Sequence, residues 1–92
     1  MKLKEWEECC CYMQKSIDQM KNEYGADIRL SKVMLGNNEY LAADVYDSGG
    51  DLYKSFTAII RDKDEPDGIS AKERSIRNID DCMCRLEEEM FA

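Results

Sequence analysis

The sequence predicts a single α+β domain, residues 1–92, in which two helices pack on one face of a three-stranded antiparallel sheet, a β-meander, in the order α-β-β-β-α. Three observations lead to this prediction. Apolar residues recur every three or four positions near both ends of the chain, they alternate every second position in the middle, and short turns rich in Gly and Asn separate the alternating segments.

The first helix is predicted over residues 3–24. Gly25 follows it as a C-terminal cap, because glycine has no Cβ and adopts a left-handed conformation at little cost. The spacing puts Cys10 in the buried stripe and points Cys11 away from the core. The complete stripe is Leu3, Trp6, Cys10, Met13, Ile17, Met20 and Tyr24.

Three strands are predicted over residues 27–35, 39–47 and 52–61, where apolar and polar side chains alternate. The segments between them, at residues 36–38 and 48–51, are short enough to require antiparallel hairpins.

The predicted register follows from the residues at the centre of each turn, which we expect to be Asn37-Asn38 and Gly49-Gly50. The expected pairs are Met34 with Leu41, Leu30 with Val45, Asp47 with Leu52, Tyr46 with Tyr53, Ala43 with Phe56 and Leu41 with Ala58. One face then carries Ile28, Leu30, Met34, Leu41, Ala43, Val45, Phe56, Ala58 and Ile60, with Lys32 and Lys54 at its rim.

The second helix is predicted over residues 71–90, after a charged loop at residues 62–68. Ser70 and Glu73 form a capping box at its start, because each side chain satisfies a main-chain N–H that the helix leaves free. Its apolar stripe consists of Ile76, Ile79, Met83, Leu86 and Met90, flanked by Cys82 and Phe91.

The second face of the sheet has no helix left to cover it, since both helices pack on the first. Tyrosines and apolar side chains with few charges are typical of the centre of a binding interface. An exposed face whose tyrosines serve β-propensity is the alternative. A partner or a second copy is expected on Val33, Leu35, Tyr40, Asp44, Tyr46, Tyr53 and Ile59, and an exposed edge strand is another route to a homodimer.

Charge is unevenly distributed: the chain carries −7, and residues 62–92 hold ten acidic against five basic side chains. Such a chain is poorly suited to bind nucleic acid directly, because that affinity comes from Lys and Arg. Clustered carboxylates can occupy a basic site on a protein partner, although acidic helix ends also serve solubility. The candidate contacts are Asp62, Asp64, Glu65, Asp67, Asp80, Asp81, Glu87, Glu88 and Glu89.

The composition argues against an enzyme and against a metal or other cofactor. The chain has no histidine, which is the commonest general base and metal ligand near neutral pH. The five cysteines stand as a triplet at residues 9–11 and as a pair at 82 and 84, which matches neither a disulfide framework nor zinc-site spacing. The acidic loop departs from an EF-hand, since Pro66 stands at a ligand position.

Reduced thiols indicate a cytoplasmic protein. The start of the chain, MKLKEWEE, lacks the apolar stretch of a signal peptide, and no apolar run is as long as a membrane span.

The small size, acidic charge and α-β-β-β-α order resemble those of small acidic phage proteins that inhibit bacterial defence nucleases, such as anti-CRISPR inhibitors that mimic nucleic acid. The resemblance implies a non-enzymatic inhibitor that blocks the basic nucleic-acid-binding site of a partner such as a CRISPR effector, in the host cytoplasm if phage-encoded. The alternatives are a homo-oligomeric structural or regulatory protein that binds through its tyrosine-bearing face, and a small-ligand sponge.

Overall fold

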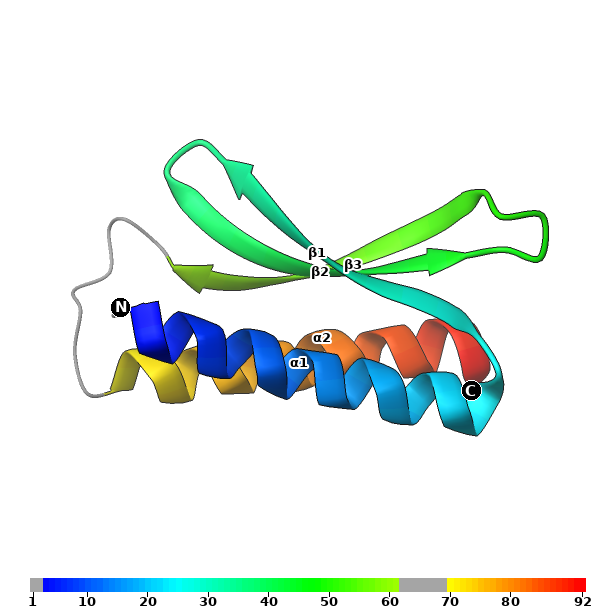
Figure 1. The fold of residues 1–92 in the computed structure, drawn as a ribbon, viewed down its shortest axis with the longest axis horizontal. Helices are drawn as coiled ribbons and strands as arrows, with labels where there is room; N and C mark the ends of the chain where they lie inside the picture. The colour runs from blue at the N-terminus through cyan, green and yellow to red at the C-terminus, as the bar shows by residue number, and fades with distance from the viewer. Residues whose placement is uncertain (1–2, 62–69) are drawn as a thin grey trace.

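Two helices lie side by side beneath a twisted three-stranded sheet (Figure 1). A computed structural model describes residues 3–61 and 70–92. The elements are α1 (Leu3–Tyr24), β1 (Asp27–Leu35), β2 (Asn38–Tyr46), β3 (Leu52–Arg61) and α2 (Ser70–Phe91). The sheet is antiparallel with strand order β1-β2-β3, so the predicted fold class and element order are confirmed.

The first helix ends where the sequence predicts. Gly25 has a φ of 66°, and its N–H donates to the carbonyl of Lys21 at 2.8 Å, which closes the last turn. At the start of α2, the predicted capping side chain of Ser70 lies outside the described part of the structure, as does the loop of residues 62–69. Within residues 3–61 and 70–92, neither helix combines the length and the apolar content that crossing a membrane requires.

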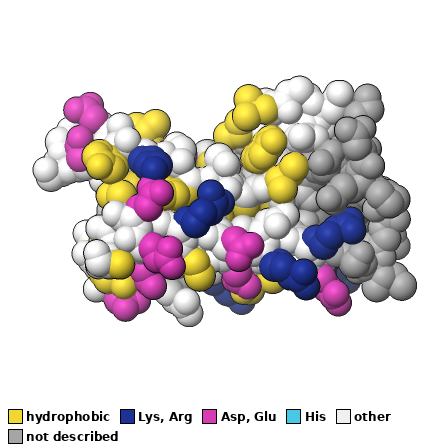
Figure 2. All heavy atoms as spheres, turned by 180° about the vertical axis from the view of Figure 1, so that it is seen from behind, with side chains coloured by type: hydrophobic (Ala, Val, Ile, Leu, Met, Phe, Trp, Pro, Cys, Tyr) yellow, Lys and Arg dark blue, Asp and Glu magenta, His cyan; other side chains and the backbone are white. Residues whose placement is uncertain are grey.

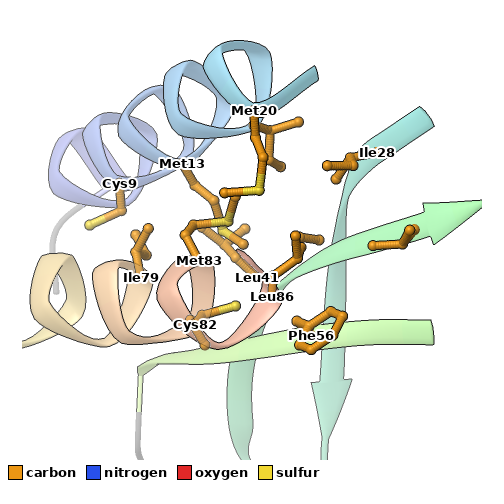
Figure 3. Packing of buried hydrophobic residues seen from close by; sticks show 14 of the residues in the cluster. Cys9, Met13, Met20, Ile28, Leu41, Phe56, Ile79, Cys82, Met83 and Leu86 are labelled. Atoms are coloured by element: carbon orange, nitrogen blue, oxygen red, sulfur yellow. The ribbon is translucent and has the colours of Figure 1, made fainter. Parts of the chain in front are cut away.

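The core lies between the helices and the covered face of the sheet. Met13, Ile79 and Leu86 are completely buried, and Figure 3 shows side chains of both helices gathered around Leu41 and Phe56 of the sheet. A fully buried side chain of this size contributes roughly 1.5–3 kcal/mol through removal of apolar surface from water. The two helices and the sheet therefore stabilise each other through one shared apolar layer.

Cys9, and not Cys10, is the fully buried cysteine of α1. Cys9 has no exposed surface, whereas Cys10 is half-buried and packs at the margin of the core. The reason is that α1 contacts both the sheet and α2, so the centre of its buried side follows Cys9, Met13 and Ile17 at intervals of four residues. Cys11 is exposed, as predicted.

The register of the first hairpin differs from the prediction by two residues. The turn is centred on Gly36 and Asn37, because Gly36 takes a left-handed φ of 63°. A shift of two residues keeps every side chain on its predicted face. Met34 nevertheless has 67% of its surface exposed. The observed pairs are Leu30 with Ala43, Lys32 with Leu41, and Met34 with Glu39.

The second hairpin keeps the predicted pairs of Ala43 with Phe56 and Leu41 with Ala58. Near the turn the prediction is wrong, because Tyr46 pairs with Leu52 and leaves Tyr53 as the extra residue of a β-bulge. The cause lies in Asp47, whose carboxylate accepts hydrogen bonds from the N–H groups of Gly49 and Asp51 and whose own N–H donates to the carbonyl of Asp51. The turn is therefore one residue longer than expected.

Side chains of α2 cap three carbonyls along the outer edge of β3, where Ile60 is the extra residue of a second β-bulge. The hydrogen bonds run from Asn78 Nδ2 to the Ile59 carbonyl at 3.0 Å, from an Arg85 Nη to the Thr57 carbonyl at 3.1 Å, and from Ser75 Oγ to the Ile60 carbonyl at 2.9 Å. An outer strand with free main-chain groups invites pairing with another chain. The second helix protects the sheet on this side.

Candidate functional site

Two tyrosine–carboxylate hydrogen bonds join the helices along the line where they meet. The hydroxyl of Tyr12 donates to Asp80 at 2.6 Å, and that of Tyr24 donates to Glu87 at 3.1 Å. The ring of Tyr24 also stacks on Phe91, with 4.2 Å between the ring centroids. Two of the predicted partner-binding carboxylates are therefore held in place by residues of α1.

A shallow groove of about 250 Å³ lies between the helices beside these bonds. Its buried part is apolar, since Met20 and Met83 have less than a tenth of their surface exposed, and three carboxylates border it. None of the described residues that line it is a lysine or arginine. They are Ser16, Gln19, Met20, Glu23, Asp80, Met83, Cys84 and Glu87.

This combination suits the side chain of an arginine or lysine. The aliphatic part of such a side chain packs on apolar surface while its charged end stays near water, and charged hydrogen bonds to carboxylates are stronger than neutral ones. The groove thus offers both parts of what a basic side chain needs: methionine surface and the carboxylates of Glu23, Asp80 and Glu87. We call this feature the acidic groove.

The remaining acidic candidates of α2 lie outside the acidic groove. Asp81 and Glu88 are exposed, while Glu89 forms an ion pair with Lys54 of β3. The ion pair engages Glu89 with its own chain, so this carboxylate is less available to a partner than Glu88. The other four candidates, Asp62, Asp64, Glu65 and Asp67, lie outside the described residues.

Basic side chains stand among the acidic ones on part of the surface. Figure 2, seen from behind, shows Lys and Arg side chains alternating with Asp and Glu side chains over the face it presents. Arg77 and Arg85 of α2 are both exposed. The acidic groove differs from this mixed surface because carboxylates are the only charged groups among its described lining residues.

The uncovered face of the sheet is arranged in rows across the strands. Val33, Tyr40 and Ile59 pair in one row and are all half-buried. Leu35, two residues farther along β1, has 61% of its surface exposed. At the opposite end, Tyr46 is half-buried while Leu52 and Tyr53 have 55% and 65% of their surfaces exposed. Hydrophobic side chains accordingly gather near both raised hairpins in Figure 2.

Two pairs of polar side chains interact on the uncovered face. Arg29 forms two hydrogen bonds to Asp27, at 3.1 and 3.2 Å, and its guanidinium lies 4.3 Å from the ring centre of Tyr46. Asp44 accepts a hydrogen bond from Ser55 at 2.7 Å. Asp44, a predicted contact, is therefore engaged within the sheet.

The cysteines divide into core and surface residues. Burial raises the pKa of the Cys82 thiol to about 11, and burial also raises the pKa of Cys9, so both resist conversion to the thiolate. Cys11 and Cys84 are exposed, and all five thiols are free. Within the described part of the chain, no three His, Cys, Asp or Glu side chains are grouped so that they could hold a metal ion.

Sequence reasoning missed Glu23, which completes the acidic groove, and the hydrogen-bonding role of Tyr12. A signal was present, because Tyr12 and Glu23 are polar residues beside the apolar stripe of α1, on the side where a second helix can pack. The sequence did not indicate on which side of α1 the second helix packs.

Comparison of the chain with protein-family models, with curated proteins and with solved structures finds no match.

Proposed function

We propose that the protein is a non-enzymatic binding protein that occupies a basic site on a protein partner through the acidic groove and the neighbouring carboxylates of α2. The observation that carries the proposal is that Glu23 of α1 and Asp80 and Glu87 of α2 border the acidic groove, whose buried part is formed by Met20 and Met83. Complementary charge speeds and orients such an encounter.

The proposed partner is a nucleic-acid-handling protein whose basic site normally holds phosphates, and the outcome of binding is inhibition. The net charge of −7 supports this choice, because a negatively charged surface competes with phosphates for the same Lys and Arg side chains. An effector of bacterial defence belongs to this class of partner.

The test is retention of basic proteins from a bacterial lysate on the immobilised chain, with DNA and RNA as competitors. The double variant Asp80→Asn, Glu87→Gln removes two charges of the groove and keeps the size of each side chain. The matched control is Glu7→Gln, Asp51→Asn, which removes two charges from exposed positions away from the groove. We expect the groove variant alone to lose a nucleic-acid-handling partner that the competitors displace. Equal retention by both variants would contradict the proposal.

A second candidate function is association through the uncovered face of the sheet. The observation that favours it is the exposed apolar surface of Leu35, Leu52 and Tyr53. On the same face, Arg29 pairs with Asp27 and Ser55 pairs with Asp44, so these four polar side chains are engaged within the sheet. A variant with Tyr53→Glu and Leu35→Glu should then lose a partner that the groove variant retains.

A further inference from the structure

The two outer strands of the sheet differ in whether side chains of another element form hydrogen bonds with the main-chain groups of their outer edges. On β3, the carbonyls of Thr57 and Ile59 accept hydrogen bonds from α2. Along β1, no described residue of another element caps the main-chain groups that point away from β2. An uncapped strand of nine residues without a bulge is a surface for main-chain pairing.

The main-chain groups of the β1 edge can be identified from the registers. The N–H and C=O of one residue point to the same side of an antiparallel strand, and successive residues alternate. Since Thr57 and Ile59 point outward on β3, their partners Ala42 and Tyr40 point toward β1, where they bond to Ser31 and Val33. The outward residues of β1 are therefore Ile28, Leu30, Lys32 and Met34.

We infer that β1 pairs with β1 of a second copy of this chain, antiparallel about a two-fold axis at Ser31. In this register Leu30 of one chain faces Lys32 of the other, and Ile28 faces Met34. All four outward residues are then paired in both chains, which gives the longest ladder that the strand allows.

Like-charge repulsion and the length of the ladder together favour this register over the alternatives. An axis at Arg29 would set two arginines directly opposite each other, and an axis at Lys32 would do the same with two lysines, which is unfavourable across a strand pair. An axis at Leu30 avoids both but shortens the ladder. With the axis at Ser31, Arg29 faces Val33, and the ammonium of Lys32 stays over the ring of Trp6 in its own chain, 5.7 Å from the ring centre.

The exposed surface of Met34 supports a second copy of the chain as the partner of the β1 edge. Met34 lies on the face that the helices cover, yet 67% of its surface is exposed. The proposed pairing sets it opposite Ile28 of the other chain, which has 1% exposure and belongs to the core cluster. Met34 thereby extends the apolar layer of the second chain, and the symmetry repeats this contact.

The first experiment measures the mass of the purified chain in solution by sedimentation. We expect a dimer for the native chain and for Lys32→Ala, and a monomer for Lys32→Pro. The two variants both lack the lysine, but only proline removes the outward N–H that the pairing uses, and that N–H takes no part in the ladder with β2. A native monomer, or a Lys32→Pro variant that remains a dimer, would overturn the inference.

The second experiment tests the register by oxidation in a background in which Cys10, Cys11 and Cys84 are replaced by alanine. At the two-fold axis, Ser31→Cys sets two Cα atoms about 4.5 Å apart, within disulfide range. Arg29→Cys sets its two copies about 13 Å apart, beyond that range. We expect a covalent dimer only from Ser31→Cys. Cross-linking of Arg29→Cys instead, or of neither variant, would overturn the register.

Both experiments use the chain alone, so their outcomes are independent of whether a basic partner binds the acidic groove. If β1 instead pairs with a strand from another protein, the purified native chain should be a monomer.

Discussion

Nδ2 of Asn78 on α2 lies 3.0 Å from the carbonyl oxygen of Ile59 and donates a hydrogen bond to it, which fixes the second helix to the outer edge of the sheet. We expect Asn78→Ala to lower the free energy of unfolding by about 1–2 kcal/mol, because a half-buried acceptor loses its donor. Chemical denaturation measures this change. Glu88→Ala on the exposed side of the same helix is the control and should change stability by less than about 0.5 kcal/mol. An equal effect of the two substitutions would contradict the capping role.

The cysteines predict a pH dependence. The pKa of Cys82 in the folded chain, about 11, lies above its ordinary value of 9.0. Its contribution to stability is therefore complete below pH 9 and is lost as the pH rises toward 11, because the unfolded thiol gives up its proton first. Thermal unfolding between pH 8 and 11 should show a decline that Cys82→Ala reduces. A decline of unchanged size in that variant would assign it to other groups.

Thiol labelling tests which cysteines are buried and which are exposed. We expect Cys11 and Cys84 to react rapidly with an alkylating reagent in the folded chain, and Cys9 and Cys82 to react only after unfolding, because burial shields them and raises the pKa of each thiol. Mass spectrometry of the labelled peptides measures this. Rapid labelling of Cys9 would show that the centre of the buried side of α1 lies elsewhere.

Replacing Gly25 should destabilise the fold through the backbone conformation alone and not through a steric clash. A Cβ at this position meets no atom within 4 Å, so Gly25→Ala is strained only through its φ of 66°. We expect a loss of stability of about 1 kcal/mol for alanine and a smaller loss for asparagine, which tolerates the left-handed conformation better. Denaturation of the two variants side by side measures the difference, and equal losses would contradict this explanation.

Glu88 and Glu89 are neighbours in α2 that we expect to have different roles, one in binding a partner and the other in an ion pair within the chain. Glu89 is engaged by Lys54, whereas Glu88 is exposed. We therefore expect Glu88→Gln to weaken retention of a basic partner more than Glu89→Gln does, and Glu89→Gln to lower stability by less than about 1 kcal/mol, because the ion pair is on the surface. Retention on the immobilised chain at low salt measures the first effect. A larger loss of retention for Glu89→Gln would contradict this assignment.

Much of the fold could be predicted from the sequence, because periodicity distinguishes helix from strand and turn residues mark the boundaries. The predicted register of the first hairpin differs from the observed one by two residues, because either Gly36 or an asparagine can take the left-handed position of the turn. Which residue takes it depends on the packing of the whole sheet. Cys9 was missed for a related reason, since the buried side of α1 depends on two neighbours at once.

The candidate site was predicted less well than the fold. The acidic character of α2 was evident from the sequence, but the acidic groove requires Glu23 of α1 to stand opposite Asp80 and Glu87. That arrangement is set by how the two helices pack, which residue spacing along one helix does not specify. The closure of β3 by Asn78 and Arg85 was likewise invisible, because it depends on which strand lies beside α2.

The closed edge of β3 also limits growth. Fibrils built by strand addition need two open edges on every subunit, one to accept a neighbour and one to offer to the next. With α2 bonded along β3, addition of strands at β1 stops after two chains, since each has used its open side. Loss of Ser75, Asn78 and Arg85 together would leave the carbonyls of β3 uncapped and give each chain a second edge to which a strand could add.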